Sequence, residues 1–350
     1  MKLTRDELKG LMKNKLQKAG LSEKHADDTA EVLTWADERG YHSHGAVRVE
    51  YYAERIAKGG INTNPKFEFK KTGPASGVFE GDNGCGYPIA IEATEEAIKM
   101  AKESGIAVVG MRQMSHSGSI GYYTEMCANE GLVAISFCQS DPMAVPYGGT
   151  EPYYGTNPIS FAAPGTNGRN LVFDMATTVQ AWGKILDKKS KGEDIPADWA
   201  VDKDGKPVTD PHKVNALVPI AGAKGYGLMM LVDVFSGVLL DVPFGGHVSS
   251  MYHDLSKGRD LGQMIIVMDP KRFMDPEIFR ERIGQTMDEL NEMKAVEGYG
   301  QVYYPGQRAN LRKEKAEKEG GIEIVDAIVE YLKSDDIHFD RYDNKNRFAE

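Results

Sequence analysis

Short apolar runs bounded by glycine, which begin near residue 76, constrain the fold of this chain most strongly. Runs of this kind are typical of strands. Segments with helical periodicity lie between some of the runs, which predicts a mixed α/β or α+β domain around a central sheet. The predicted strands span residues 106–111, 132–138, 159–163, 171–173 and 264–268, and the helices between them include 90–102, 120–129, 227–240 and 276–293.

The two ends of the chain carry helical patterns instead. Thr4 and Glu7 make a capping box ahead of an apolar stripe, which marks the start of a first helix. A third helix is predicted to start near Ser43 and to run to about residue 57, and apolar residues predict a helix over 322–334. These end segments could pack together beside the sheet.

The charge balance and the use of cysteine exclude several classes of protein. The formal net charge is -10, whereas nucleic-acid binding requires a basic surface, so no nucleic-acid partner is expected. The three cysteines are too few and too scattered for a disulfide framework. The N-terminus lacks an apolar signal core and no stretch of about 18 apolar residues is found, so a cytoplasmic protein with no membrane partner is expected.

Two glycine-rich turns bear on nucleotide binding. Gly84 and Gly86 give the nearest match to a G-x-G-x-x-G fingerprint, but the third glycine is missing and Pro88 lies inside the motif. We therefore interpret this segment as a turn and a helix start, and an ordinary Rossmann site is not predicted. The second turn, 222–227, contains Lys224 and leads into an apolar helix, where backbone N–H groups and a lysine suit a phosphate. Glycines that allow close helix packing explain this second turn equally well.

The most concentrated polar and aromatic segment of the N-terminal region contains His44, Arg48 and Tyr52. If Ser43 caps the helix, these three side chains are spaced four residues apart and share one face. An arginine can bind a carboxylate through two parallel hydrogen bonds, and a tyrosine one turn further can bind a second polar group. A solvated face on which Arg48 pairs with a nearby glutamate such as Glu54 is an equally good interpretation.

Candidates for chemistry in the sheet region lie at strand ends. His116 follows the strand at 106–111 and precedes a helix, and sites in α/β domains collect at the carboxyl ends of strands. A histidine titrates near neutrality, so its ring can accept a hydroxyl proton while hydride leaves the same carbon. Loops that contain Ser140, Thr156 and Asp174 adjoin three other strands. Turns of this composition are often only structural, although three of them at strand ends favour a shared pocket.

Several of these segments together resemble the type-2 malate/L-lactate dehydrogenase family. Members of that family oxidise small 2-hydroxy acids, or reduce the matching 2-oxo or imino acids, with NAD or NADP, and they are unrelated to Rossmann dehydrogenases. The similarity runs nearly end to end and accounts for the missing fingerprint. The matching segments are 42–52, 114–118, 139–149, 154–164, 173–183, 224–230 and 301–307.

The resemblance implies a discontinuous helical domain, residues 1–75 with about 308–350, and a sheet-containing, non-Rossmann domain over 76–307 that binds the dinucleotide. It also implies a homodimer whose cofactor cleft lies near the subunit contact. NAD is expected rather than NADP, because no arginine cluster suited to a 2′-phosphate stands out in the sequence.

By position, the resemblance implies roles for individual residues of this chain. His116 matches the proton acceptor of the family. Arg48 and Tyr52 match its substrate-binding helix, and His44 lies beside them. The residues that match segments lining the cofactor are Ser140, Asp174, Met175, Ala176, Lys224 and Gly306.

Segments 48–56, 138–143, 173–184 and 249–252 match one branch of the family particularly closely. That match implies oxidation of (S)-ureidoglycolate to oxalurate, a step of allantoin breakdown. Other activities of the family stay open, namely malate, lactate or sulfolactate dehydrogenase or an imino-acid reductase. Two interpretations come from other classes: an inactive binding scaffold and a metal-dependent amide hydrolase that uses His42 and His44. No H-E-x-x-H motif or tight acidic cluster completes a ligand set, so no metal is expected.

Overall fold

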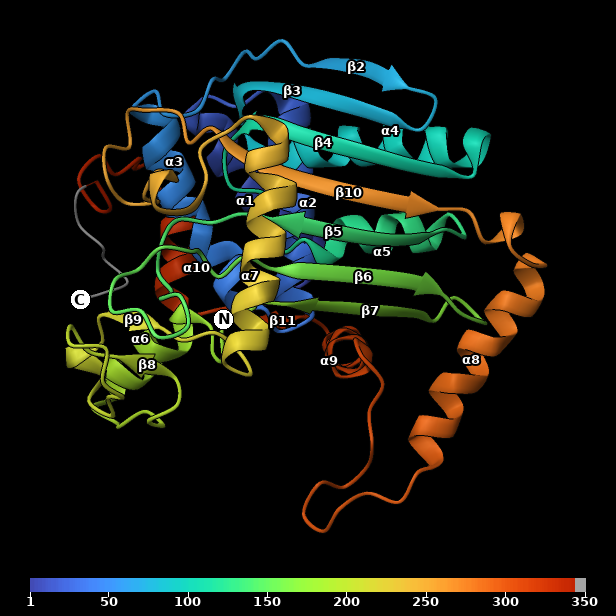
Figure 1. Ribbon diagram of the computed structural model, residues 1–350. Helices are drawn as coiled ribbons and strands as arrows, with labels where there is room; N and C mark the ends of the chain where they lie inside the picture. Colours follow the sequence, from blue (N-terminus) through green and yellow to red (C-terminus); the bar gives the residue numbers. More distant parts are fainter. Residues whose placement is uncertain (344–350) are drawn as a thin grey trace.

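The computed structural model describes residues 1–343, and a seven-stranded sheet forms its centre (Figure 1). The strand order is β2-β3-β4-β10-β5-β6-β7, and within the described residues β3 and β4 are the only parallel neighbours in this sheet. A Rossmann sheet is mostly parallel, so the predicted mixed, non-Rossmann class is confirmed. The strands are β2 (Glu68–Gly73), β3 (Ser76–Gly84), β4 (Ile106–Met114), β5 (Val133–Cys138), β6 (Ile159–Pro164), β7 (Asn170–Met175) and β10 (Leu261–Met268).

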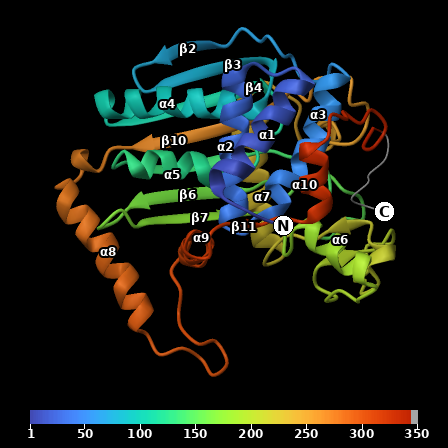
Figure 2. The ribbon, with the colours of Figure 1, turned by 180° about the vertical axis from the view of Figure 1, so that it is seen from behind.

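Helices cover both faces of the sheet (Figures 1 and 2). On one face lie α4 (Gly86–Ser104) and α5 (Gly121–Asn129), while α7 (Ala223–Ser236) crosses the other. Outside α4 pack α1 (Arg5–Ala19) and α2 (Glu23–Glu38). The capping box at Thr4 is present at the start of α1, as the sequence predicts.

One hydrophobic cluster joins the N-terminal helices to the sheet. It includes Leu8 and Met12 of α1, Ala97 of α4, and Val109 and Ile265 of the central strands, all fully buried. Burial of apolar surface on this scale is the main stabilising contribution to the fold. The N-terminal helices, α4 and the central strands therefore share one hydrophobic core.

The first residues of the chain lie beside a segment from its C-terminal part. β1 (Lys2–Leu3) pairs antiparallel with β11 (Ile322–Glu323), and α10 (Asp326–Lys333) follows β11. The predicted helix over 322–334 was therefore wrong in its first residues, because Ile322 pairs with Leu3. The domain division at 75/76 and about 308 stays a prediction; β2 and β3 pair across its first boundary. Residues 344–350 of the predicted helical domain lie outside the described residues.

The segment predicted as one helix from Ser43 is interrupted. Two 3₁₀ turns, η1 (His42–His44) and η2 (Ala46–Arg48), precede α3 (Val49–Ala57). The buried Asp37 carboxylate accepts the N–H of Ala46 at 2.7 Å and lies 2.9 Å from Nδ1 of His42. A Cβ at Gly45 would overlap the Asp37 carboxyl group, so the chain turns there around a carboxylate that only glycine can approach. Sequence periodicity alone does not reveal this buried acid.

Two further parts extend from the sheet (Figure 1). A small lobe contains α6 (Trp182–Lys191) and the paired strands β8 (Ala200–Val201) and β9 (Ala216–Leu217), around its own apolar cluster. An arm formed by α8 (Pro276–Glu292) and a long loop leads to α9 (Gln307–Lys318). Of these elements, the sequence analysis predicted only α8.

α7 is the most apolar helix of the fold. The window Ala223–Leu240 is long and apolar enough, by length and composition, to cross a membrane, and 39% of it is buried. The expectation that no such stretch exists was therefore wrong. One face of α7 rests on the protein core through Met229 and Val232, which are fully buried. This one-sided burial is the pattern of a helix packed on a sheet.

Candidate active site

His116 lies in the loop between β4 and α5, at the carboxyl end of β4. Its Nδ1 is 2.6 Å from the hydroxyl oxygen of Tyr52 in α3. The ring centroid of His44 is 5.9 Å from that of His116. Two candidates from the N-terminal region, Tyr52 and His44, thus contact the imidazole of a third, His116.

Burial controls the protonation of the two histidines. It lowers the pKa of His116 well below its usual range, and the nearby His44, Arg48 and Arg259 act in the same direction. Burial also lowers the pKa of His44 to about 3, assisted by Arg48. Both rings are therefore neutral at pH 7. A neutral imidazole carries a lone pair on one ring nitrogen and can accept a proton.

Arg48 ends the second 3₁₀ turn, directly before α3. Its Nε donates to the carbonyl oxygen of Ser43 at 2.6 Å, and its Nη1 donates to the hydroxyl of Tyr252 at 3.1 Å. The glutamate considered as a local partner, Glu54, accepts backbone N–H groups of residues 341–343. These contacts orient the guanidinium near His116, where it can meet a substrate carboxylate.

A second guanidinium near His116, the buried Arg259, was not predicted from the sequence. It donates to the carbonyl oxygen of Ser249 at 2.7 Å and lies 3.4 Å from the Asp141 carboxylate. Asp141 also accepts the N–H of Met251 at 3.0 Å, and the Met251 sulfur is 3.9 Å from Nη1 of Arg48. The same loop therefore contacts both arginines. No local pattern marks Arg259, because its position depends on this long-range loop contact.

The first turn of α4 supports the His116 loop. The segment interpreted as a turn and a helix start is confirmed as such, since β3 ends at Gly84 and α4 begins at Gly86. The Gly86 N–H donates to Oγ of Ser115 at 2.9 Å. A Cβ at position 86 would lie 2.5 Å from the carbonyl oxygen of His116. The glycine is thus required for the close approach of helix and loop.

Tyr87, the next residue of α4, was also missed. Its hydroxyl oxygen is 2.8 Å from that of Tyr52, which in turn contacts His116. Its ring packs against Gly118, whose φ of +77° and lack of Cβ permit the contact. The available signal was its position directly after Gly86, in a motif considered only for dinucleotide binding.

The first group of cofactor candidates lies beside α7, where the loop between β5 and β6 meets the loop after β7. Oγ of Ser140 accepts the N–H of Thr156 at 2.9 Å, and the N–H of Thr177 donates to the carbonyl oxygen of Thr156 at 2.9 Å. Asn157 donates to a backbone carbonyl of α7 at 3.0 Å. Lys224 lies exposed in the first turn of the same helix. Both ends of the loop between β5 and β6, and the loop after β7, are therefore brought together beside α7.

The second group lies at the start of α5 and α9. Asp174 of the candidate segment 174–176 accepts the N–H of Gly121 at 2.8 Å. Burial raises the pKa of Asp174 to about 6, although this hydrogen bond acts in the opposite direction. Gly306 precedes α9 with a φ of +87°, and a Cβ there would lie 2.6 Å from the carbonyl oxygen of Val172. The start of α9 is thus held against β7, the strand that ends at Met175.

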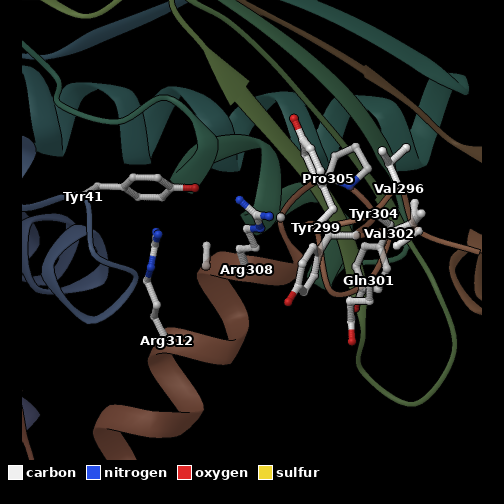
Figure 3. A pocket seen from close by; sticks show the side chains of 13 residues that line it. Tyr41, Val296, Tyr299, Gln301, Val302, Tyr304, Pro305, Arg308 and Arg312 are labelled. Carbon is white, nitrogen blue, oxygen red and sulfur yellow. The ribbon is translucent and has the colours of Figure 1, made fainter. Parts of the chain in front are cut away.

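A cavity of about 490 Å³ opens beside Gly306 (Figure 3). Arg308 and Arg312, one turn apart on α9, line it together with Tyr41. No arginine cluster stands out in the sequence because α9 was not predicted, and the two arginines gather only on that helix. Two guanidinium groups at a helix N-terminus suit phosphate oxygens. The residues present fit the anionic part of a dinucleotide.

Among residues 1–343, no group of three or more histidine, cysteine, aspartate or glutamate side chains is arranged to hold a metal ion. His42 instead contacts Asp37, and Nδ1 of His44 is 2.9 Å from Oγ of Ser43. A neutral imidazole beside a guanidinium, with a cavity lined by two arginines in the same molecule, suits a nucleotide-dependent dehydrogenase that acts on a hydroxy acid.

The chain belongs to the malate/L-lactate dehydrogenase family, whose sequence model matches residues 3–333, and it is an oxidoreductase. It is 56% identical over 350 residues to ureidoglycolate dehydrogenase (NAD(+)) of Escherichia coli (strain K12), and the match covers 100% of both chains. The solved sulfolactate dehydrogenase from Methanocaldococcus jannaschii is 35% identical, covers 95% of this chain and 96% of its own, and superposes with a TM-score of 0.88. The malate dehydrogenase of Pyrococcus horikoshii is 35% identical over 343 residues, 95% of this chain and 94% of its own. The predicted family is confirmed.

Proposed function

We propose that this chain oxidises (S)-ureidoglycolate to oxalurate with NAD as the hydride acceptor, as a step of purine breakdown. The observation that carries the proposal is the neutral His116 ring, held between Tyr52 and His44 with Arg48 close by. The full-length similarity to the Escherichia coli ureidoglycolate dehydrogenases supports the choice of substrate and of cofactor.

In the proposed reaction, Arg48 binds the substrate carboxylate and His116 takes the hydroxyl proton. Since Nδ1 of His116 faces Tyr52, the other ring nitrogen, Nε2, is the proton acceptor. As the O–H bond breaks, its electron pair forms the second C–O bond, and the C–H bond breaks with loss of hydride. NAD, when bound, supplies the nicotinamide carbon that accepts this hydride and its two electrons. The products are a 2-oxo acid, a proton held on His116 and reduced cofactor.

Asp141 and Arg259 support a ureido substrate over malate or sulfolactate. A ureido group carries N–H donors and a carbonyl acceptor, and this pair offers a carboxylate acceptor and a guanidinium donor 3.4 Å apart. The distal carboxylate of malate or sulfonate of sulfolactate has no N–H to donate, so it would leave the Asp141 carboxylate without a donor from the substrate. We assign the ureido end of the substrate to this pair.

For the cofactor, Arg308 and Arg312 would hold phosphate groups at the start of α9. Ser140, Lys224 and residues 174–176 would line the remainder of the dinucleotide, with Gly306 at the turn before α9. The fit rests on the cavity beside Gly306 and on its two arginines.

We also propose a cytoplasmic homodimer in which α7 forms part of the subunit contact. Side chains on the outer face of α7 and the turn after it are between 37% and 62% exposed, namely Leu228, Met230, Leu231, Val234, Val238 and Leu239. Exposed apolar side chains that gather on one helix in this way are typical of a protein interface. The three buried free cysteines fit a reducing compartment.

A panel of substrates tests the activity. NADH formation is followed by absorbance with freshly prepared (S)-ureidoglycolate, malate, L-lactate and sulfolactate, each with NAD and with NADP. The expected result is the highest kcat/KM for ureidoglycolate with NAD. A higher kcat/KM for malate, lactate or sulfolactate would overturn the substrate while leaving the family intact.

A further inference from the structure

The glycine motif at the start of α4, which the reaction does not use directly, leads to the His116 ring through two tyrosine hydroxyls. Tyr87 lies 2.8 Å from Tyr52, and Tyr52 lies 2.6 Å from Nδ1 of His116, measured between the heavy atoms. We propose that Tyr87 is a positioning residue, which acts through Tyr52 to keep His116 in the tautomer that has its hydrogen on Nδ1 and a lone pair on Nε2.

The reason is the number of hydrogens that Tyr87, Tyr52 and His116 can share in their hydrogen bonds. Tyr52 has one hydroxyl hydrogen but two neighbours, so it donates to one of them and accepts from the other. If Tyr52 donates to Tyr87, it accepts the Nδ1–H of His116, and Nε2 is a proton acceptor. If Tyr52 donates to Nδ1, Nε2 carries the hydrogen and cannot accept another. Which of the two hydroxyls donates in the hydrogen bond between Tyr52 and Tyr87 therefore decides the tautomer of His116.

The protonated form of His116 also depends on the Tyr87 oxygen. After His116 accepts a proton, both of its nitrogens carry hydrogen, so Nδ1 can only donate to Tyr52. Tyr52 must then turn its own hydrogen elsewhere, and the oxygen of Tyr87 is the acceptor at 2.8 Å. The same hydroxyl thus stabilises the neutral base and the imidazolium that it becomes.

Burial keeps both tyrosines available for this role. Tyr52 is 1% exposed and Tyr87 is 0% exposed, so solvent does not replace either partner. Burial raises the pKa of Tyr52 and of Tyr87 well above the usual range, and both hydroxyls retain their hydrogen. Each hydroxyl therefore has one hydrogen to donate, and the pair can be oriented in two directions, of which the protonated His116 ring requires donation from Tyr52 to Tyr87.

Tyr87 is also held rigidly. It sits in the first turn of α4, directly after Gly86, which contacts the His116 backbone, and its ring packs on Gly118 of the same loop. Its ring meets that of Tyr52 edge to face, with centroids 5.6 Å apart. The helix therefore fixes the loop backbone and the hydroxyl chain together.

The substitution Tyr87→Phe tests the proposal by kinetics, and this arm rests on the proposed function. Without the Tyr87 oxygen, Tyr52 donates to Nδ1, which favours the other tautomer and disfavours the imidazolium. We expect kcat for oxidation to fall on the order of tenfold, with KM for the hydroxy acid little changed. The pKa of His116 falls, so the acid limb of kcat/KM moves to lower pH by about half to one unit.

Tyr123→Phe is the matched control. Tyr123 is equally buried, and its hydroxyl donates to the carbonyl oxygen of Ser117 at 2.6 Å. Ser117 belongs to the His116 loop, but this hydrogen bond does not lead to the His116 ring. We expect no displacement of the acid limb in this variant. An equal displacement in both variants would mean that loop packing, rather than the hydroxyl chain, is responsible, and would overturn the proposal.

A double substitution tests whether Tyr87 acts through Tyr52. In a Tyr52→Phe background, Tyr87→Phe should cause no further fall in kcat, because the connection to His116 is already broken. A second, independent tenfold loss would contradict the proposed route.

The tautomer itself is measured without substrate or turnover. In protein labelled with ¹⁵N-histidine, with the His116 signals identified by their loss in His116→Ala, we expect Nδ1 protonated and Nε2 unprotonated in the parent, and the reverse in Tyr87→Phe. A parent protein with hydrogen on Nε2 would overturn the proposal even if a variant failed to fold. This result is independent of the substrate, so it separates failure of the tautomer proposal from failure of the proposed function.

Discussion

At the scale of single residues, the neighbour of each functional atom decides what a side chain can do. Tyr52 was predicted to bind substrate, but its hydroxyl lies 2.6 Å from the ring of His116 and 2.8 Å from Tyr87. A hydroxyl with two protein partners has little capacity left for a ligand. We therefore propose that Tyr52 supports the base, while its contact with the substrate stays a prediction.

His116→Ala removes the proposed proton acceptor. General-base help contributes about 10²–10⁴-fold, so kcat should fall by a factor in that range. NAD affinity, followed by protein fluorescence, should be nearly unchanged, because the cavity beside Gly306 is built by other residues. An alanine variant with the kcat of the parent would show that another group accepts the proton.

Arg48→Ala and Arg48→Lys test the carboxylate site as a pair. Alanine removes charge and hydrogen bonds, whereas lysine keeps the charge without the planar pair of donors. We expect KM for the hydroxy acid to rise by about tenfold or more in Arg48→Ala and by less in Arg48→Lys, with kcat less affected. A change confined to the KM of NAD would contradict the assignment.

His44→Gln tests the effect of burial on pH stability. The pKa of His44 is about 3 in the folded protein, below its ordinary value of about 6.5. Between these values the unfolded chain binds a proton that the folded protein does not, so stability is lost as the pH falls below about 6.5. The loss between pH 7 and pH 5 should be smaller in His44→Gln by up to about 2 kcal/mol, measured by urea unfolding. An identical loss in variant and parent would contradict the shift.

At the scale of elements, short contacts of the main chain determine where the site forms. α4 begins at a glycine so that its first turn can touch the backbone of the His116 loop, and η1 turns around the Asp37 carboxylate so that His44 reaches the same loop. Neither contact follows from helical periodicity, which is why the start of α4 was predicted but its function was not.

Gly86→Ala and Gly10→Ala should have opposite effects on stability. A Cβ at position 86 would lie 2.5 Å from the carbonyl oxygen of His116, whereas a Cβ at position 10, inside α1, meets nothing within 4 Å. We expect Gly86→Ala to lower the free energy of unfolding by about 1–3 kcal/mol and to lower kcat. Gly10→Ala should raise that free energy by about 0.5–1 kcal/mol with parental kcat. Equal effects in urea unfolding would refute the close contact at Gly86.

At the scale of the whole molecule, the two faces of the sheet have different surroundings. Helices α4 and α5, with α1 and α2 outside them, cover one face, whereas in the described part of the chain α7 is the helix that crosses the other (Figures 1 and 2). The outer side of α7 carries exposed apolar side chains. The position of α7 explains why its composition resembles that of a membrane helix. The helix is apolar on both sides, toward its own core and toward the proposed partner subunit.

Val234→Glu and Val325→Glu test the proposed dimer contact. Both valines are exposed, at 43% and 67%, but Val234 lies on α7 and Val325 at the start of α10. A charge buried in an apolar interface is strongly unfavourable, so Val234→Glu should convert the dimer into monomers, while Val325→Glu leaves it intact. Light scattering during size-exclusion chromatography measures both masses. A dimeric Val234→Glu protein would exclude this face.

The sequence by itself determined the features that depend on neighbours a few residues away. The capping box at Thr4 and the apolar runs of β4, β5, β6 and β10 were predicted with nearly the observed limits. Resemblance to a family added the roles proposed for His116 and Arg48. Local periodicity and capping express interactions within one or two turns, so a linear pattern is enough to reveal them.

Only the tertiary structure decided how these parts form a site. Tyr52 and His116 are 64 positions apart in the chain, and Arg259 reaches Asp141 across 118 positions. Tyr87 and Arg308 had no local signal of function, since each acquires its partners only when α4 meets the His116 loop and α9 meets the end of β7. The physical reason is that hydrogen bonds and burial act between surfaces brought together by the fold, which residue spacing along the chain does not record.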